Sequence, residues 1–152
     1  MKAQQFIKDH GLEKAREVVE GAPECGQPLY FNTTNGVYLF TGYRNTYFVN
    51  GVWGTEDDHP SMQEQTFKAV SITQLKSLVE SVDLVNDLGG MEKLTPYFIT
   101  TDKRLGYTHV NMAANGRICF LDEFCDFIPE QAISIKRVME AIKAYASIYG
   151  EE

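Results

Sequence analysis

The sequence predicts an α+β fold, in which helices pack against an antiparallel β-meander within a single domain, residues 1–152. The first observation behind this prediction is the stretch 29–53, which holds eight of the eighteen aromatic residues. The second is that it contains Asn35-Gly36 and Asn50-Gly51. Asn-Gly between short β-forming runs is the strongest local signal for a two-residue hairpin, because both central residues need positive φ. The third is a set of apolar residues with helical spacing outside this stretch.

Residues 2–21 are expected to form two short helices separated by Gly11. Phe6 and Ile7 give the first helix an apolar face, and Gly21 ends the second. Two helices joined at a glycine also suggest a DNA-reading helix-turn-helix. However, three glutamates oppose two cations on the second helix, which is a poor balance for approaching phosphates. Nucleic acid is therefore an unfavoured partner.

Four strands are expected in the aromatic stretch, at about 29–34, 37–42, 45–50 and 52–55, and residues 67–72 could add another. Residues 37–41 carry large apolar groups in both alternating sets. A sheet that is wetted on one side alternates more cleanly. We therefore expect either that both faces are covered or that one face displays aromatic residues, and coverage is the favoured interpretation.

The clearest helix is predicted at residues 74–88, with Ser71 or Thr73 as its cap and Gly89-Gly90 as its end. Its apolar residues form one continuous stripe: Leu75, Leu78, Val79, Val82, Val85 and Leu88. Residues 87–94 also repeat a pattern of residues 9–15, namely a helix, a glycine break and an apolar-Glu-Lys-apolar start. Similar helix caps explain this repeat better than a duplicated unit does.

After a short helical turn at 91–94, before Pro96, a strand is expected at 97–100. A hairpin around Asn115-Gly116 should join strands at 107–113 and 117–121. The last helix should begin at about Pro129 or Ser134 and end at Tyr149. Its expected buried face, with Ile148 at the margin, is Ile135, Val138, Met139, Ile142, Tyr145, Ala146 and Tyr149.

The net charge is −7, from 21 acidic and 14 basic residues, which favours solubility and disfavours non-specific binding to nucleic acid. No apolar run approaches the roughly 20 residues needed to span a bilayer. The N-terminal residues mix charges with apolar positions, unlike a signal peptide. Three cysteines at distant positions do not suggest a secreted disulfide framework. These observations favour a cytoplasmic protein.

The search for catalytic chemistry produces no convincing motif. Cys25 could act as a nucleophile with a histidine as base, but its neighbour Glu24 disfavours a thiolate. Cys119 is expected to be a buried thiol, because free cysteine is among the most buried residue types. We predict no metal site and no cofactor, and an enzyme is the less favoured class. The remaining polar candidates for a pocket between sheet and helices are Asp57, Asp58, His59 and His109.

Residues 6–17, Phe-Ile-Lys-Asp-His-Gly-Leu-Glu-Lys-Ala-Arg-Glu, resemble the start of small uncharacterised accessory proteins carried by lambda-like temperate phages and prophages. Residues 74–81 together with 89–93 are similar to another stretch of such proteins. The resemblance covers about a quarter of the chain and includes no catalytic motif. It implies a small cytoplasmic protein, dispensable for phage assembly, that binds and modulates a host or phage macromolecule.

The first functional hypothesis is therefore a non-enzymatic phage or prophage accessory protein that binds and modulates a host or phage protein. The candidate contacts are Tyr43, Arg44, Tyr47 and Trp53, because aromatic and arginine side chains supply most binding hot spots. The alternative is a small-ligand- or metal-binding protein or an enzyme, with the polar pocket named above. An uncovered edge of the meander could also pair with a second copy to form a homodimer.

Overall fold

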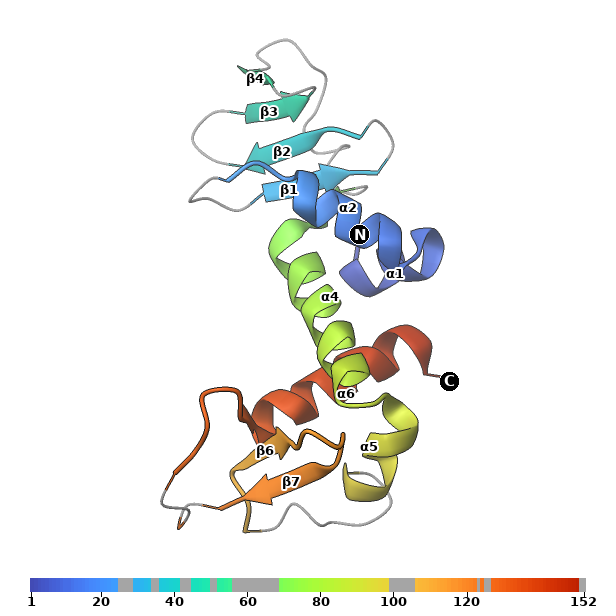
Figure 1. The fold of residues 1–152 in the computed structure, drawn as a ribbon. Helices are drawn as coiled ribbons and strands as arrows, with labels where there is room; N and C mark the ends of the chain where they lie inside the picture. Colours follow the sequence, from blue (N-terminus) through green and yellow to red (C-terminus); the bar gives the residue numbers. More distant parts are fainter. Residues whose placement is uncertain are drawn as a thin grey trace. The chain divides into compact units, whose positions relative to one another are not determined.

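A computed structural model of the chain describes residues 1–24, 29–33, 36–41, 45–49, 52–55, 69–98, 106–122, 124 and 127–150 (Figure 1). Its contacts divide the chain into two compact units, Met1–Val79 and Glu80–Glu152. The boundary falls inside helix α4 (Ile72–Asp87). Helices and antiparallel sheets occur together in the chain, so the predicted α+β class is confirmed. The expectation of a single domain stays a prediction.

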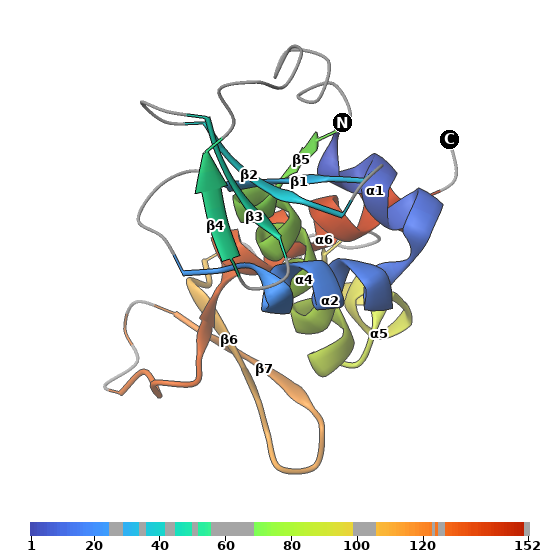
Figure 2. The ribbon, with the colours of Figure 1, turned by 90° about the horizontal axis from the view of Figure 1, so that it is seen from above.

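The first unit contains a five-stranded antiparallel sheet with the order β4-β3-β2-β1-β5. Figure 1 shows β4, β3, β2 and β1 one below another in this order, and Figure 2 shows the strands of this sheet, with β5, from above. Four consecutive strands form the predicted meander, and the fifth returns beside β1. Their bounds are β1 (Leu29–Asn32), β2 (Tyr38–Thr41), β3 (Asn45–Val49), β4 (Val52–Thr55) and β5 (Ala69–Ser71).

The hairpins of the meander differ in loop length. Val49 pairs with Val52, so two residues join β3 to β4, as the Asn50-Gly51 pair predicts. Between β1 and β2, the Asn32 N–H donates to the Val37 carbonyl at 2.9 Å, which leaves a four-residue loop. The prediction of a two-residue turn there is wrong. Gly36 still takes positive φ, +72°, but as the last residue of the longer loop.

Two helices, α1 (Ala3–His10) and α2 (Leu12–Gly21), precede the sheet as predicted. The Phe6 ring meets the Phe31 ring of β1 edge to face, with centroids 6.3 Å apart. The N-terminal ammonium donates to the Ala69 carbonyl of β5 at 3.0 Å. The Tyr38 hydroxyl of β2 donates to the Val18 carbonyl of α2 at 2.6 Å. Both helices are thereby attached to the sheet.

Both faces of the sheet are covered at its described centre, which was the favoured interpretation. Phe31 pairs with Tyr38 in the register, so Leu39 points to the opposite face from Phe31. Phe31 is 8% exposed and Leu39 is 2% exposed. Val70, opposite Phe31 on β5, is fully buried.

Helix α4 contains the predicted stripe up to Val85, and Leu88 follows just after its end; all six predicted stripe residues are buried. Ser71 is its cap, because its Oγ accepts the Gln74 N–H at 3.4 Å. At the other end, the Gly90 N–H donates to the Val85 carbonyl and the Gly89 N–H to the Asn86 carbonyl. These two bonds form a Schellman motif, which satisfies carbonyls that the ending helix would leave unpaired.

The second unit packs helices on a three-stranded antiparallel sheet with the order β7-β6-β8. Its core unites the second half of α4 with the helices and strands that follow, and Val85, Leu94, Val110 and Val138 are fully buried there. The bounds are α5 (Met91–Phe98), β6 (His109–Met112), β7 (Ile118–Leu121), β8 (Ile133–Ser134) and α6 (Ile135–Tyr149).

Helix α5 corrects two predictions. Tyr97 and Phe98 belong to this helix and not to a strand, and Pro96 lies inside it and not after it. Proline removes one backbone donor from the helix, but Leu94 and Phe98 on either side are buried in the core. Tertiary packing therefore outweighs the local signal for a helix end. The rest of the predicted strand lies outside the described residues.

The β6–β7 hairpin forms at the predicted place with a different turn. The Gly116 N–H donates to the Ala113 carbonyl, and the Ala113 N–H donates to the Arg117 carbonyl. These bonds enclose three loop residues, with Gly116 at φ +81°. This is the loop of a type I turn followed by a glycine bulge, rather than a two-residue type I′ turn.

Helix α6 begins after Ser134, whose Oγ accepts the Arg137 N–H at 3.1 Å. This agrees with the second of the two predicted starts. Its last turn differs from the prediction, because Ile148 is 5% exposed while Tyr149 is 47% exposed and Ala146 is also exposed. Ile148 and Tyr149 both lie next to the apolar stripe of α6. Ile148 is fully apolar and is buried, whereas Tyr149 keeps its hydroxyl in water.

Candidate functional site

The predicted interaction residues are only partly described. Tyr43 and Arg44 lie outside the described residues. Tyr47 and Trp53 belong to β3 and β4, where the structure describes the backbone pairing and not the side chains. Their role as contacts therefore stays a prediction.

Of the alternative polar site, the structure describes one member. Asp57, Asp58 and His59 lie outside the described residues, as does Cys25. His109 is part-buried on β6, where its Nδ1 lies 2.9 Å from the Thr108 Oγ1. Its strand neighbours are Leu121 and Ser134.

Cys119 is exposed, so the prediction of a buried thiol is wrong. Along β7 the buried side belongs to Ile118, and the adjacent Cys119 points the other way. Phe120, two residues after Ile118, packs against the rings of Tyr97 and Phe98 with centroids 5.6 and 5.8 Å apart. Large apolar neighbours on one strand face thus decide the orientation of the smaller residue between them.

The most exposed apolar group of the described chain follows β7. Phe124 is 83% exposed and Phe127 is 76% exposed, and Ile128 beside them is also exposed. We call these three residues the exposed apolar segment. It belongs to the stretch that leads from β7 to β8, whose described part is coloured orange to red in Figure 1. Large aromatic side chains left in water are unusual on a monomer and often mark a binding surface.

Local hydrogen bonds hold the loop on both sides of this segment. The Phe124 N–H donates to the Asp122 Oδ1 at 3.0 Å, and the Ala132 N–H donates to the Pro129 carbonyl at 3.0 Å. The first bond is an Asx-type turn, and the second closes a β-turn before β8. The first turn fixes the backbone at Phe124, and the second fixes the backbone just after Ile128.

The charge around the segment is of one sign. Residues 121–131 contain four carboxylates and no lysine or arginine. The sequence prediction missed this segment because three apolar residues with the i, i+3, i+4 spacing of a helix face do not reveal whether that face is covered. The available signal was the alternation of acidic and aromatic residues just before Pro129.

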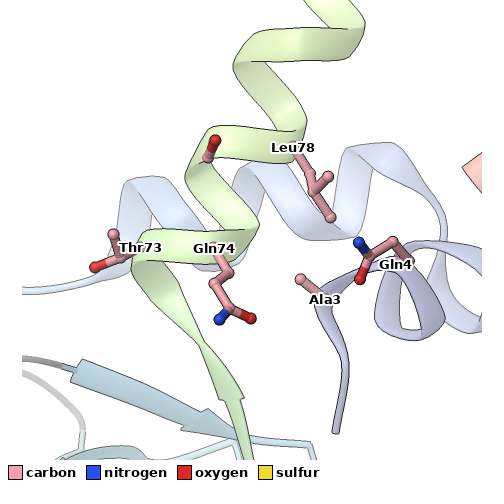
Figure 3. Close-up of a pocket in the computed structure, with 6 residues that line it drawn as sticks. Ala3, Gln4, Thr73, Gln74 and Leu78 are labelled. Carbon is pink, nitrogen blue, oxygen red and sulfur yellow. The ribbon is translucent and has the colours of Figure 1, made fainter. Parts of the chain in front are cut away.

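The first unit contains a hollow between the start of α1 and the start of α4 (Figure 3). Its volume is about 450 Å³, and it is lined by Ala3, Gln4, Thr73, Gln74, Ser77 and Leu78. The polar lining consists of neutral amides and hydroxyls, which can hydrogen-bond a small polar molecule. None of the described residues that line this hollow is acidic or basic.

Within the described residues, no cluster of three or more histidine, cysteine or acidic side chains could hold a metal ion. In the same part of the chain, no helix has both the length and the apolar character needed to cross a bilayer. Comparisons of the chain with protein-family models, with curated proteins and with solved structures found no match.

Proposed function

We propose that this chain is a non-enzymatic accessory protein of the phage or prophage type, which binds and modulates a host or phage protein. The observation that carries the proposal is the exposure of Phe124 and Phe127, with one turn at Asp122 and another that begins at Pro129. The phage assignment is supported by the sequence resemblance alone.

The energetics favour this segment as a binding element. A phenylalanine side chain buries about 150–250 Å² when it is fully covered. At about 25 cal/mol per Å², two such rings contribute several kcal/mol before the cost of association is subtracted. The four nearby carboxylates add attraction toward a partner with a basic rim and raise the rate of encounter.

The test is capture from bacterial lysate with the tagged full chain, followed by mass spectrometry. A protein recovered at near stoichiometry by the natural chain should be lost with Phe124→Ser/Phe127→Ser. Tyr149→Ser, which removes an exposed aromatic from α6, serves as the matched control and should retain the partner. Equal recovery by the double variant would overturn this assignment of the binding surface.

The earlier candidates are tested in the same assay. Tyr43→Ala and Trp53→Ala should each fold, as judged by circular dichroism, and weaken capture of the same protein if the meander shares the interface. Unchanged capture would restrict the interface to the exposed apolar segment.

The hollow between α1 and α4 favours a second candidate, binding of a small neutral polar ligand. A ligand that binds only the folded protein raises the melting temperature. Thermal shifts with a panel of sugars, amides and nucleosides, together with metals, would detect such binding. Ser77→Met, which fills the hollow, should remove any shift that arises there.

A further inference from the structure

The second unit, which contains the exposed apolar segment, also has a surface whose charge is opposite to the charge around that segment. A groove of about 650 Å³ runs along α6, and it is lined by Lys136, Met139, Glu140, Ile142, Lys143 and Ala146. The groove is largely open to solvent, so the apolar side chains of a partner can reach its floor.

The groove has an apolar floor and a mainly basic rim. Met139, Ile142 and Ala146 supply the floor. Lys136 and Lys143 are seven residues apart, which places them on one side of the helix about 10 Å from each other. Glu140 lies between them, and no ion pair among the described residues joins it to either lysine. The rim therefore carries a net positive charge.

The exposed apolar segment matches this groove in three respects. Its two phenylalanines are apolar, like the floor. They are three residues apart, a span of about 10 Å in an extended chain, which is comparable with the spacing of the lysines. The four carboxylates of residues 121–131 are opposite in sign to the rim. In the chain itself both rings are exposed, so they do not fill its own groove.

We infer that the α6 groove of one molecule receives the exposed apolar segment of a second copy of this chain. Because each molecule carries both halves of the contact, two copies can insert their segments reciprocally and close a symmetric dimer. The inference rests on the proposed function in one respect, since both use the exposed apolar segment. Self-association then competes with the binding of another protein, so the dimer conceals the surface that the monomer offers.

The test is sedimentation velocity of the full chain over a wide range of protein concentration, at low and at high salt. The natural chain should form a dimer that weakens at high salt, because the contact joins opposite charges. Lys136→Glu/Lys143→Glu should weaken self-association at least about tenfold, equivalent to about 1.4 kcal/mol. Both lysines are exposed, so this groove variant should fold, which circular dichroism checks.

A mixture of two defective variants gives the sharpest result. The groove variant keeps an intact segment, and Phe124→Ser/Phe127→Ser keeps an intact groove. Each should be monomeric alone, while their mixture restores one of the two contacts and should form a heterodimer. A natural chain that stays monomeric at every concentration would overturn the inference. So would a groove variant that dimerises like the natural chain, because the dimer would then use another surface, such as an edge of the meander.

The same variants separate this inference from the proposed function. If the groove variant captures the partner from lysate but no longer self-associates, both proposals stand. If the groove variant still captures the partner and still self-associates, while the phenylalanine variant loses capture, only the proposed dimer is excluded. If the phenylalanine variant still captures the partner but cannot dimerise, only the proposed binding surface is excluded.

Discussion

The same short pattern, a glycine followed by apolar-Glu-Lys-apolar, opens helix α2 and helix α5. The local geometry of the two starts is nearly identical. The Gly11 carbonyl accepts the Ala15 N–H at 3.2 Å, and the Gly90 carbonyl accepts the Leu94 N–H at 3.2 Å. Gly11 has φ +90° and Gly90 has φ +89°. The sequence repeat therefore corresponds to a repeat of backbone structure.

The attachment of these two helices to their sheets is different. For α2, the sheet supplies the donor, because the Tyr38 hydroxyl bonds the Val18 carbonyl. For α5, the helix supplies the donor, because the Lys93 ammonium bonds the Gly116 carbonyl of the β6–β7 loop. The equivalent lysine of α2, Lys14, is exposed and pairs with Glu17 of its own helix at 3.6 Å.

A glycine lies against each of these attaching side chains. A Cβ at Gly21 would come 2.9 Å from the Tyr38 hydroxyl, and a Cβ at Gly89 would come 2.5 Å from the Lys93 Cδ. The comparison teaches that a short pattern determines the start of a helix, while residues twenty or more positions away determine how that helix is attached.

The largest expected effect concerns the apolar residue that ends the repeated pattern. Leu94→Ala should destabilise the protein by about 2–5 kcal/mol, because Leu94 is fully buried and its loss leaves a cavity. Met91→Ala, on the same helix but only part-buried, should cost clearly less. Urea denaturation followed by circular dichroism measures both. If Leu94→Ala cost less than Met91→Ala, the residues packed around α5 would have to move and fill the cavity.

Much of the fold could be predicted because its signals are local. The stripe of α4, its Ser71 cap and the two-residue link between β3 and β4 all depend on residues a few positions apart. The failures depend on distant partners. Pro96 remains helical because its neighbours are buried, and Cys119 points outward because the larger residues beside it face the core.

The candidate site was missed for a related reason. Burial and exposure of an aromatic residue outside regular structure depend on what the rest of the chain covers, and no periodicity indicates it. The sequence therefore drew attention to the dense aromatic stretch of the meander. The exposed phenylalanines lie instead in an acidic loop of the second unit.

Three glycine substitutions test whether the two helix breaks are equivalent. Gly11→Ala and Gly90→Ala should each reduce the free energy of unfolding by about 1–3 kcal/mol, because positive φ strains a residue with a Cβ. A Cβ added at either position would meet no atom of another part of the chain within 4 Å, so backbone strain is the only expected cost. Gly89→Ala should cost more, because its Cβ also displaces Lys93. The excess should disappear in a Lys93→Ala background. An excess that persists there would exclude Lys93 as its cause.

The two lysines of the repeat should differ in their contribution to stability. Lys93→Ala removes a charged donor from the Gly116 carbonyl and should cost about 1.5 kcal/mol. Lys14→Ala breaks an exposed pair with Glu17 and should cost no more than about 0.5 kcal/mol. High salt should reduce the small effect at Lys14. Equal costs in denaturant titrations would contradict the proposed difference in attachment.

The last expected effect, at Tyr38, is modest and should depend on pH. Tyr38→Phe removes one neutral hydrogen bond and should cost about 1 kcal/mol at neutral pH. Burial raises the pKa of the Tyr38 hydroxyl above its ordinary value of 10.0, because burial disfavours the phenolate. Below pH 10.0 the hydroxyl is protonated in both the folded and the unfolded chain, so its contribution is complete.

As the pH rises past that value, the unfolded chain releases this proton more readily than the folded chain does, and stability falls. Tyr38→Phe lacks the titrating group, so the advantage of the natural chain over the variant should shrink between neutral pH and about pH 11. Comparing the two chains cancels the titration of the other tyrosines. Denaturant midpoints measured at several pH values provide the difference. If the stability difference between the two chains stayed constant across this range, the Tyr38 hydroxyl would have the same pKa in the folded and unfolded chains. Burial and the bond to Val18 would then not affect its ionisation.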